Sequence, residues 1–169
     1  MSNTENLNHK EAINKLKSLV DDIMICFFCT NLKTDDGSNC RPMKVIKVCD
    51  QGNIWFFSEK SSDKNKDITS DKNVRLLFSH PAKNSYLVVN GEAEIILDKT
   101  KIEELWTLEA KIWFKEGKDD LNISIIKVIP KMAYYWDTDG SRMINFLKIV
   151  ASVVTGINLV NGNQGTITV

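Results

Sequence analysis

A run of hydroxyl and ammonium groups follows an aromatic segment at residues 56–68, which reads FFSEKSSDKNKDI. Four of its side chains could help to hold an anion: Ser58, Ser61, Ser62 and Lys64. A helix that begins at Ser61 or Ser62 would add backbone N–H groups that favour phosphate, and the lysine would add a point charge. Serine- and lysine-rich stretches are also common in solvated loops, so a phosphate-binding site and an ordinary loop are both open interpretations.

An arginine on the preceding strand favours the phosphate-binding interpretation. Arg41 begins the segment RPMKV, and the turn DQGN around Gly52 is expected to reverse the chain into a hairpin. This hairpin would place Arg41 opposite residues 60–64, where its guanidinium and the Lys64 ammonium converge. The aromatic run of residues 55–57 is expected to form an apolar wall that could face a flat aromatic ring.

The other reactive side chains form no recognisable catalytic or metal-binding motif. The chain has two histidines, His9 and His80, and no second C-x-x-C pair, so we expect no metal site. It also lacks the phosphate-binding motifs G-x-G-x-x-G and G-x-x-x-x-G-K-[ST] and the nucleophile elbow G-x-S-x-G. If the protein is an enzyme, we expect a bound cofactor to supply the chemistry.

The four cysteines are expected to be free thiols. Cys26 and Cys29 form a C-x-x-C motif, but redox-active pairs of this kind stand at a helix N-terminus, whereas DIMICFFCTNL resembles a strand. The start of the chain is polar and unlike a signal peptide, and its apolar runs are shorter than the roughly 20 residues that span a bilayer. We therefore expect a soluble cytoplasmic protein, where disulfides are rare, and expect Cys40 and Cys49 to be thiols as well.

Length and charge indicate one domain that does not bind nucleic acid. The chain has 169 residues, of which 43% are hydrophobic, which suits a single domain over residues 1–169 with its own core. Lysine plus arginine and aspartate plus glutamate each total 22, so the basic excess of a nucleic-acid-binding protein is missing. An anion that binds here must be small and must be met by a local cluster of residues.

The hydrophobic pattern predicts a mostly β protein with peripheral helices. Alternating or continuous apolar runs predict strands at residues 23–32, 41–49, 53–58, 73–80, 85–97 and 123–137. Helical spacing predicts helices at residues 8–23, 98–114 and 141–156, the first with a capping box from Asn8 and Glu11. Gly91 is expected to mark a bulge or a close backbone approach. We expect disorder at residues 1–8, a C-terminal helix and tail at 141–169, and a mostly antiparallel barrel between them.

Six short motifs, taken in order, resemble the general stress protein 26 family of the pyridoxamine 5'-phosphate oxidase-like superfamily. They are Arg41-Pro42-Met43, GNIWFFS, SSDK, VVNGEAEII, ELW…WF and YYW, within a similarity that spans about residues 10–156. The resemblance implies the FMN-binding split-barrel fold, a six-stranded antiparallel split β-barrel of Greek-key type with peripheral helices. It also implies a homodimer that binds two FMN molecules at the subunit interface.

The same resemblance implies roles for individual residues. The strand from Arg41 to Lys44 would border the flavin, and Phe57 and Ser58 match an aromatic-hydroxyl pair of the family. Ser62 and Lys64 fall on the Ser-x-Lys motif with which the family binds the phosphate. Trp136 falls on a tryptophan that packs near the flavin from the other subunit. Trp113 is a further candidate to reach a partner's cofactor, whereas core packing is expected for Trp106.

The chain departs from the oxidase pattern at three places. Asp63 replaces the second basic phosphate ligand, and Ile46 replaces the lysine that meets the pyridoxal substrate. The Arg-x-His of the substrate site becomes Arg142-Met143-Ile144, which keeps the arginine and loses the histidine. Oxidation of vitamin B6 is therefore not expected, while FMN binding remains expected.

Three functions stay open from the sequence. The first is a flavin-dependent oxidoreductase that acts on an unknown small molecule, with no catalytic side chain assigned. The second is a flavin-binding stress protein without turnover, and the third is a dimeric stress protein without a cofactor. FAD, a deazaflavin or haem in the same barrel are alternatives to FMN, and neither nucleic acid nor membrane is expected as a partner.

Overall fold

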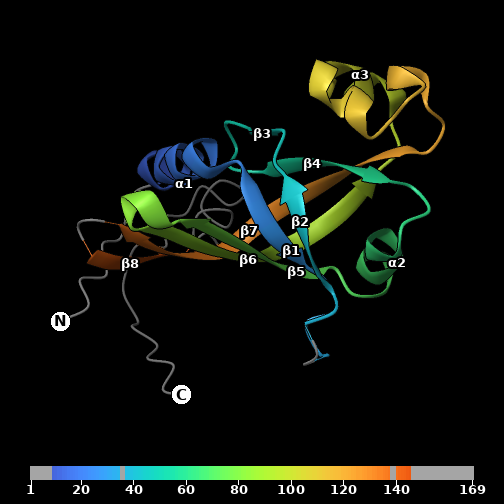
Figure 1. The fold of residues 1–169 in the computed structure, drawn as a ribbon. Helices are drawn as coiled ribbons and strands as arrows, with labels where there is room; N and C mark the ends of the chain where they lie inside the picture. The colour runs from blue at the N-terminus through green and yellow to red at the C-terminus, as the bar shows by residue number, and fades with distance from the viewer. Residues whose placement is uncertain (1–8, 35–36, 138–139, 146–169) are drawn as a thin grey trace, which may run out of the picture.

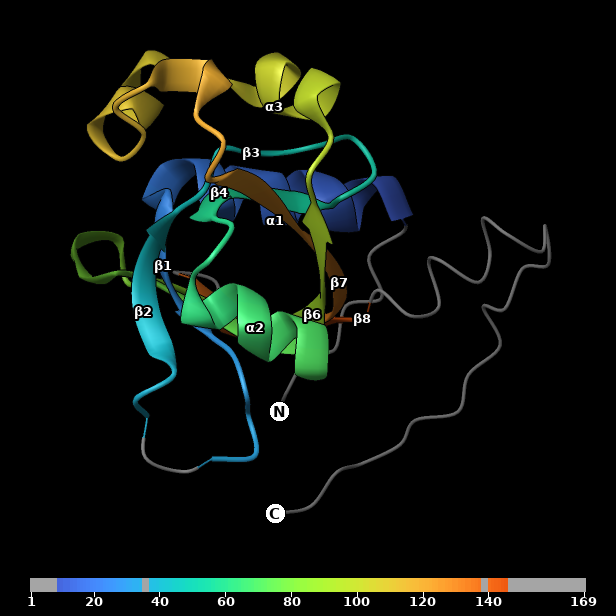
Figure 2. The same cartoon turned by 90° about the vertical axis from the view of Figure 1, so that its right-hand side faces the viewer.

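The computed structural model describes residues 9–34, 37–137 and 140–145, which form one antiparallel sheet curled into a split barrel with helices at its rim (Figures 1 and 2). The strands of this part of the chain are β1 (Ile25–Cys29), β2 (Cys40–Lys44), β3 (Lys47–Val48), β4 (Ile54–Glu59), β5 (Asn73–His80), β6 (Ser85–Ile96), β7 (Ile123–Asp137) and β8 (Gly140–Asn145). The α-helices are α1 (His9–Ile23), α2 (Asp63–Ser70) and α3 (Lys99–Leu105). Short 3-10 helices follow at η1 (Pro81–Lys83), η2 (Leu108–Ile112) and η3 (Gly117–Asp119). The predicted antiparallel barrel is confirmed, with eight strands in these residues instead of six.

The barrel closes where the chain passes from β2 to β3. The strand order is β2-β1-β5-β6-β7-β4-β3, with β8 added beside β7, so β2 and β3 stand at opposite edges of the sheet. Two residues join these edges: the Val45 N–H bonds the Met24 carbonyl and the Ile46 N–H bonds the Trp55 carbonyl, each over 2.8 Å. The predicted strand at residues 41–49 is therefore divided between the two edges.

Two apolar clusters fill the fold. The larger lies inside the barrel, where the alternating buried residues of β5 (Val74, Leu76 and Phe78) pack with α1 and the inward faces of the other strands. The smaller lies under α3 and the segment that follows it. Its buried members are Trp55, Ile102, Leu105, Ala110, Phe114, Ile123 and Ile125.

Two glycines have the backbone roles that the sequence predicted. At Gly91 the pairing of β6 with β7 shifts register, and a Cβ there would collide with the Ile129 carbonyl, so the predicted bulge and close approach are confirmed. Gly52 has a φ of +82° in the turn before β4, and its N–H bonds the Cys49 carbonyl over 2.9 Å.

The helix expected at residues 98–114 is shorter than predicted. α3 ends at Leu105 because Trp106 and Thr107 adopt extended backbone, which lets the chain turn and bury Ala110 and Phe114 in the smaller cluster. No helix in the described ranges is long and apolar enough to cross a membrane.

The helix expected at residues 141–156 is wrong where it overlaps the described residues. Residues 140–145 form β8, which pairs with the free edge of β7, where the backbone N–H and C=O groups need partners. Residues 146–169 lie outside the described part of the chain. Residues 1–8, including Asn8 of the expected capping box, lie outside it as well.

Candidate anion and cofactor site

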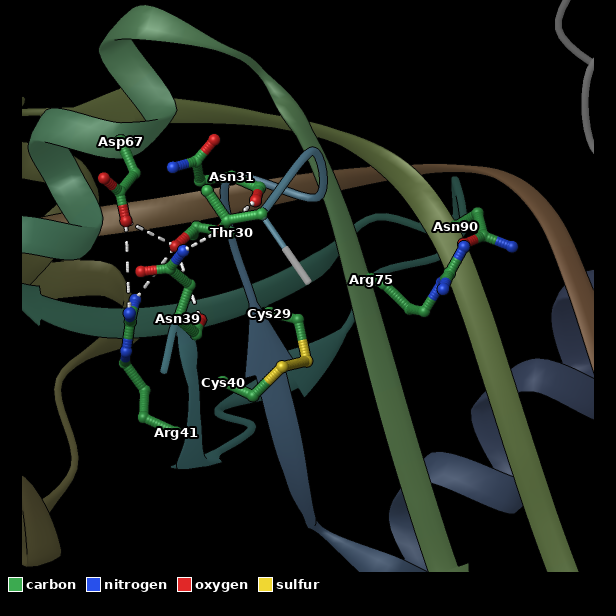
Figure 3. The surroundings of a disulfide bond; sticks show 10 residues. Cys29, Thr30, Asn31, Asn39, Cys40, Arg41, Asp67, Arg75 and Asn90 are labelled. Carbon is green, nitrogen blue, oxygen red and sulfur yellow. Dashed lines mark hydrogen bonds and ion pairs between the residues drawn. A yellow bond between two sulfur atoms is a disulfide. The ribbon is translucent and has the colours of Figure 1, made fainter. Parts of the chain in front are cut away.

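Arg41 lies beside α2, where Thr30 and Asp67 hold its guanidinium (Figure 3). Its Nη1 donates a 3.2 Å hydrogen bond to the Thr30 hydroxyl oxygen, and its Nη2 lies 4.0 Å from a carboxylate oxygen of Asp67. The Thr30 hydroxyl donates a 2.6 Å hydrogen bond to the same Asp67 oxygen. The structure thus brings Arg41 to the helix that carries Lys64.

The route by which Arg41 reaches α2 differs from the predicted one. The ladder between β3 and β4 ends at Ile46 and Trp55, so the hairpin around Gly52 does not extend back to Arg41. Instead β2 pairs with β1, with Arg41 opposite Phe28. Arg41 meets α2 because barrel closure brings the β1–β2 edge next to the end of β4, as Figure 2 shows.

Lys64 is the second cation of the site and is half-buried. Burial lowers the pKa of its ammonium, the Glu59 carboxylate acts in the opposite direction, and the positive charge of Arg41 lowers the pKa further. The two cations therefore repel each other across the first turn of α2. An anion between them would favour both charged forms.

The first turn of α2 has donors for such an anion. Ser62 is the N-cap residue, as predicted, and its carbonyl accepts the N–H groups of Asn65 and Lys66 at 3.1 and 3.3 Å. The N–H groups of Asp63 and Lys64 have no partner among the described residues. The Ser62 hydroxyl makes no capping hydrogen bond. The N-terminal end of α2 therefore presents two backbone N–H donors and one hydroxyl to an anion.

Asp63 is an acidic residue in the first turn of α2. Its carboxylate is exposed and accepts a 2.8 Å hydrogen bond from the Lys66 ammonium. This bond is the main cause of a lowered pKa for Asp63, to which the charges of Lys66 and Arg41 add. The Lys66 ammonium thus compensates the negative charge of Asp63.

A buried polar network fastens α2 to the sheet. The Ser58 hydroxyl donates a 2.8 Å hydrogen bond to Asn65 Oδ1, and Asn65 Nδ2 donates another of 2.8 Å to the Ser124 hydroxyl oxygen. The Ser124 hydroxyl then donates to the Ser58 carbonyl over 3.1 Å. Ser58 is thus a buried support of the helix, and its oxygen lies 3.4 Å from the Ser62 hydroxyl.

Sequence reasoning missed Asn65 and Ser124, although each left a signal. Ser124 is a polar residue inside the otherwise apolar run ISII, and Asn65 is an amide in the first turn of a helix. Ser61, by contrast, turns toward Asn122, whose Oδ1 is 3.3 Å from both its N–H and its hydroxyl. Ser61 therefore anchors the loop before α2 to the start of β7.

The residues after Arg41 on β2 alternate between the two faces of the strand. Met43 packs against the core of the barrel, whereas Pro42 and Lys44 are exposed. The Lys44 ammonium forms an ion pair with Glu109 of η2. At about 3.3 Å per residue, β2 extends about 10 Å from Arg41 to Lys44, so it links the α2 end of the site to the η2 end.

The aromatic run before the site does not form one wall. Phe56 faces the barrel core, where its ring centroid is 5.2 Å from that of Phe28, while Trp55 is buried in the cluster under α3. Phe57 is half-buried and makes edge contacts with Trp106 at 5.7 Å and with Phe114 at 6.1 Å. The expectation of a three-residue wall is wrong because successive strand residues point to opposite faces. The core role expected for Trp106 is confirmed.

The two other predicted tryptophans are not brought to Arg41 within one chain. Trp113 directly follows η2 as its C-cap residue and is 75% exposed. Trp136 lies near the far end of β7, opposite Tyr86 on β6, and is 41% exposed. Both side chains are available to a second molecule.

The expectation of four free thiols is wrong for two cysteines. Cys29 and Cys40 form a disulfide, which Figure 3 shows next to the Arg41 network. The antiparallel pairing of β1 with β2 places the two cysteines directly opposite each other, a relation that sequence spacing does not reveal. Cys26 and Cys49 are free, as expected, and burial raises the pKa of the Cys26 thiol to about 12.

Comparison with known families gives one match over most of the chain. The model of the family described as pyridoxamine 5'-phosphate oxidase like matches residues 11–159. No curated protein sequence matches the chain.

Solved structures with the same fold include several stress proteins. A Clostridium acetobutylicum protein described as related to general stress protein 26 of B. subtilis is 20% identical, with a TM-score of 0.69 over 83% of this chain and 98% of that chain. General stress protein 26 from Bacillus anthracis is 22% identical, with a TM-score of 0.61 over 73% of this chain and 92% of that chain. The general stress FMN/FAD binding protein of Xanthomonas citri is 20% identical, with a TM-score of 0.63 over 93% of this chain and 97% of that chain. At these identities the likeness concerns the fold.

Proposed function

Because this chain belongs to the pyridoxamine 5'-phosphate oxidase-like family, we propose that it is a flavoprotein that binds FMN and acts as a flavin-dependent oxidoreductase on a small molecule. One relative of the same fold, from Xanthomonas citri, is described as an FMN/FAD binding protein, which supports a flavin as the ligand. The site itself supports the phosphorylated form, for the reasons that follow.

The observation that carries the proposal is the meeting of Arg41 and Lys64 at the first turn of α2. In the proposed complex, the N–H groups of Asp63 and Lys64, the Ser62 hydroxyl and both cations hold the phosphate. In the same complex Arg41 would bind the phosphate while its Nη1 stays hydrogen-bonded to the Thr30 hydroxyl. The Asp63 carboxylate is paired with the Lys66 ammonium, so its negative charge is compensated within α2.

The other end of the site suits the flavin ring. β2 leads from Arg41 to Lys44, and η2 is tied to Lys44 through Glu109. We propose that the ring lies along this strand, with Trp113 as an aromatic neighbour. FMN bound here would supply hydride or electron transfer, while the protein orients it and limits its contact with water.

The proposal does not include pyridoxamine 5'-phosphate as the substrate. By the family resemblance, Ile46 falls where the oxidases carry a substrate-binding lysine, and its side chain packs against the cluster under α3. Position 46 therefore provides no positive charge that could bind the phosphate of this substrate. The side chain of Arg142 lies outside the described side chains.

A second part of the proposal is a homodimer formed through the outer face of the sheet. A row of apolar side chains, directly opposite one another in register, crosses five strands on this face: Pro42, Phe27, Leu77, Val88 and Tyr134. Phe27 is 53% exposed, and a shallow groove of about 220 Å³ runs beside it between Ile25, Pro42 and Leu77. Exposed apolar patches of this kind are typical of interfaces, and the family resemblance points to a second copy as the partner.

An absorption spectrum of the native protein tests the proposal directly. We expect a flavin spectrum, either as purified or after addition of FMN, and an FMN mass for the released cofactor. A colourless protein that does not bind added FMN would contradict the proposal and favour the alternative of a stress protein without a cofactor. A flavin spectrum without turnover of reduced nicotinamide nucleotides, with any acceptor tested, would favour a flavin-binding protein that is not an enzyme.

A further inference from the structure

The disulfide between Cys29 and Cys40 lies inside an otherwise regular ladder. Phe28 pairs with Arg41 on one side of it, and the Thr30 N–H bonds the Asn39 carbonyl over 3.1 Å on the other. The two strands are thus aligned by backbone hydrogen bonds that do not depend on the sulfur atoms. Because of this alignment, the bond can break or form again while the strands stay paired.

Each of the two cysteines precedes a residue of the Arg41 network. Thr30 follows Cys29, Arg41 follows Cys40, and their side chains meet at a 3.2 Å hydrogen bond (Figure 3). Asp67 of α2 accepts from the Thr30 hydroxyl over 2.6 Å. A cross-link between the two strands therefore restrains both residues that contact Asp67.

The two sulfur atoms differ in accessibility. Cys29 is buried, with 4% of its surface exposed, whereas Cys40 is half-buried at the start of β2. An incoming thiolate therefore has access to Cys40 and leaves Cys29 as the departing sulfur.

We propose that Cys29 and Cys40 form a reversible thiol–disulfide exchange site, opened by a dithiol reductant, and that its redox state controls how firmly Arg41 is held against α2. The consequence for ligand binding rests on the proposed FMN site, since Arg41 is one of its two cations. The disulfide form keeps Arg41 preorganised and binds FMN more tightly than the dithiol form.

The exchange balances in two steps. A thiolate of the reductant attacks Sγ of Cys40, the bond between the cysteines breaks, and its electron pair goes to Cys29, which takes up a proton. The second thiol of the reductant then attacks the mixed disulfide and releases Cys40 as a thiol. The protein gains two electrons and two protons, and the dithiol becomes a disulfide. A low-molecular-weight disulfide such as oxidised glutathione reverses the reaction.

Differential alkylation of the folded wild-type protein tests the exchange site, with dithiothreitol as the probe. After acid quenching, unfolding and alkylation, we expect label on Cys26 and Cys49 alone in protein treated with oxidised glutathione. After treatment with dithiothreitol in the folded state, we expect label on all four cysteines. Label on Cys29 and Cys40 in both samples, or in neither, would overturn the exchange site.

The coupling to Arg41 has a readout that needs no flavin. The NMR signal of the Arg41 side-chain Nε–H, assigned with Arg41→Lys, is expected to shift when dithiothreitol reduces the protein. The Cys49→Ser variant serves as the control and keeps this response. An unchanged Arg41 signal in protein whose Cys29 and Cys40 are reduced would overturn the coupling.

Titration with FMN then separates this inference from the proposed function. We expect the oxidised protein to bind FMN about three- to tenfold more tightly, which is the cost of immobilising one long side chain. The Cys29→Ser/Cys40→Ser variant should match the reduced protein. Equal FMN affinities of the oxidised and reduced protein would overturn the control of FMN binding by the disulfide, but would leave the proposal of flavin binding intact. A shifted Arg41 signal without FMN binding in either form would support the exchange site and overturn the proposed function.

Discussion

Asn65 of α2 and Ser124 of β7 are 59 residues apart in the chain, yet a 2.8 Å hydrogen bond joins their buried side chains. The same amide accepts from Ser58 of β4. The helix that presents Lys64 is thus fastened to two neighbouring strands by one side chain. The first turn of α2 has no apolar side chain, and Asn65 is its buried residue.

Replacing this amide should destabilise the fold. We expect Asn65→Ala to lower the free energy of unfolding by about 1–3 kcal/mol, since it leaves the buried Ser58 and Ser124 hydroxyls without their partner. Urea unfolding followed by circular dichroism measures the change. Ser70→Ala, in the exposed last turn of the same helix, is the control and should change stability by about 0.5 kcal/mol or less. Equal stability of both variants would contradict the anchoring role.

Loss of the Lys64 ammonium should weaken binding of the FMN phosphate and leave binding of the flavin ring unchanged. We expect Lys64→Ala to lower FMN affinity about ten- to a hundredfold, because a charge-assisted hydrogen bond contributes about 1.5–3 kcal/mol. Riboflavin, which lacks the phosphate, should bind the variant and the wild type equally. Fluorescence titration measures both ligands, and the exposed Lys72→Ala is the matched control. An equal loss for riboflavin would place Lys64 away from the phosphate.

Arg41 should differ from Lys64 in its response to a conservative change. Arg41→Lys keeps the charge and loses the planar fork that reaches Thr30 and Asp67. We therefore expect this variant to lose about tenfold in FMN affinity, close to the loss in Arg41→Ala. The same fluorescence titration measures this loss. An FMN affinity of Arg41→Lys equal to that of the wild type would mean that Arg41 contributes through its charge alone.

FMN affinity should depend on pH through Lys64. Burial lowers the pKa of this lysine in the free protein, so the ammonium loses its proton at a lower pH than an ordinary lysine. Bound phosphate favours the charged form, so binding takes up a proton in this range. We therefore expect affinity to fall as pH rises through the lowered pKa and to lose this step in Lys64→Ala. A pH profile of FMN affinity that is identical in wild type and variant would exclude Lys64 as its source.

The proposed dimer should depend on the apolar row of the outer face. Phe27→Glu places a charge in the middle of this row, between Pro42 and Leu77, and we expect it to give monomers. Sedimentation equilibrium measures the mass. Leu121→Glu changes a more exposed leucine, 90% accessible, outside this row, and should leave the dimer intact. Dimers in both variants would mean that the copies meet elsewhere.

The strands were predictable where one face of the sheet is buried. β5 alternates buried and exposed residues along NVRLLFSH, and β7 is a long apolar run, so periodicity alone located both. Gly91 was predictable for a similar reason, since a glycine inside a strand marks a bulge. The proximity of Arg41 to Lys64 was predicted as well, but from a hairpin around Gly52 that does not extend back to Arg41.

Features that depend on strand register were not predictable. The disulfide needs Cys29 opposite Cys40, and the spacing of cysteines does not specify which strands pair. The predicted strand at residues 41–49 breaks because Val45 and Ile46 bond to different strands, which is a property of the closed barrel. Asn65 was missed because its partners, Ser58 and Ser124, lie on two strands that meet only in the folded sheet.

The two hydrogen bonds of Val45 and Ile46 form the seam at which the sheet closes into a barrel. Arg41 lies on one side of this seam and the loop that leads to Lys64 begins on the other, so neither half of the sheet alone holds both cations. A transient opening of this seam would loosen the edge that carries Arg41 while the hairpin of β6 and β7 stays intact. In the proposed complex such an opening would let FMN leave, and hydrogen exchange at the Val45 and Ile46 amides would report its frequency.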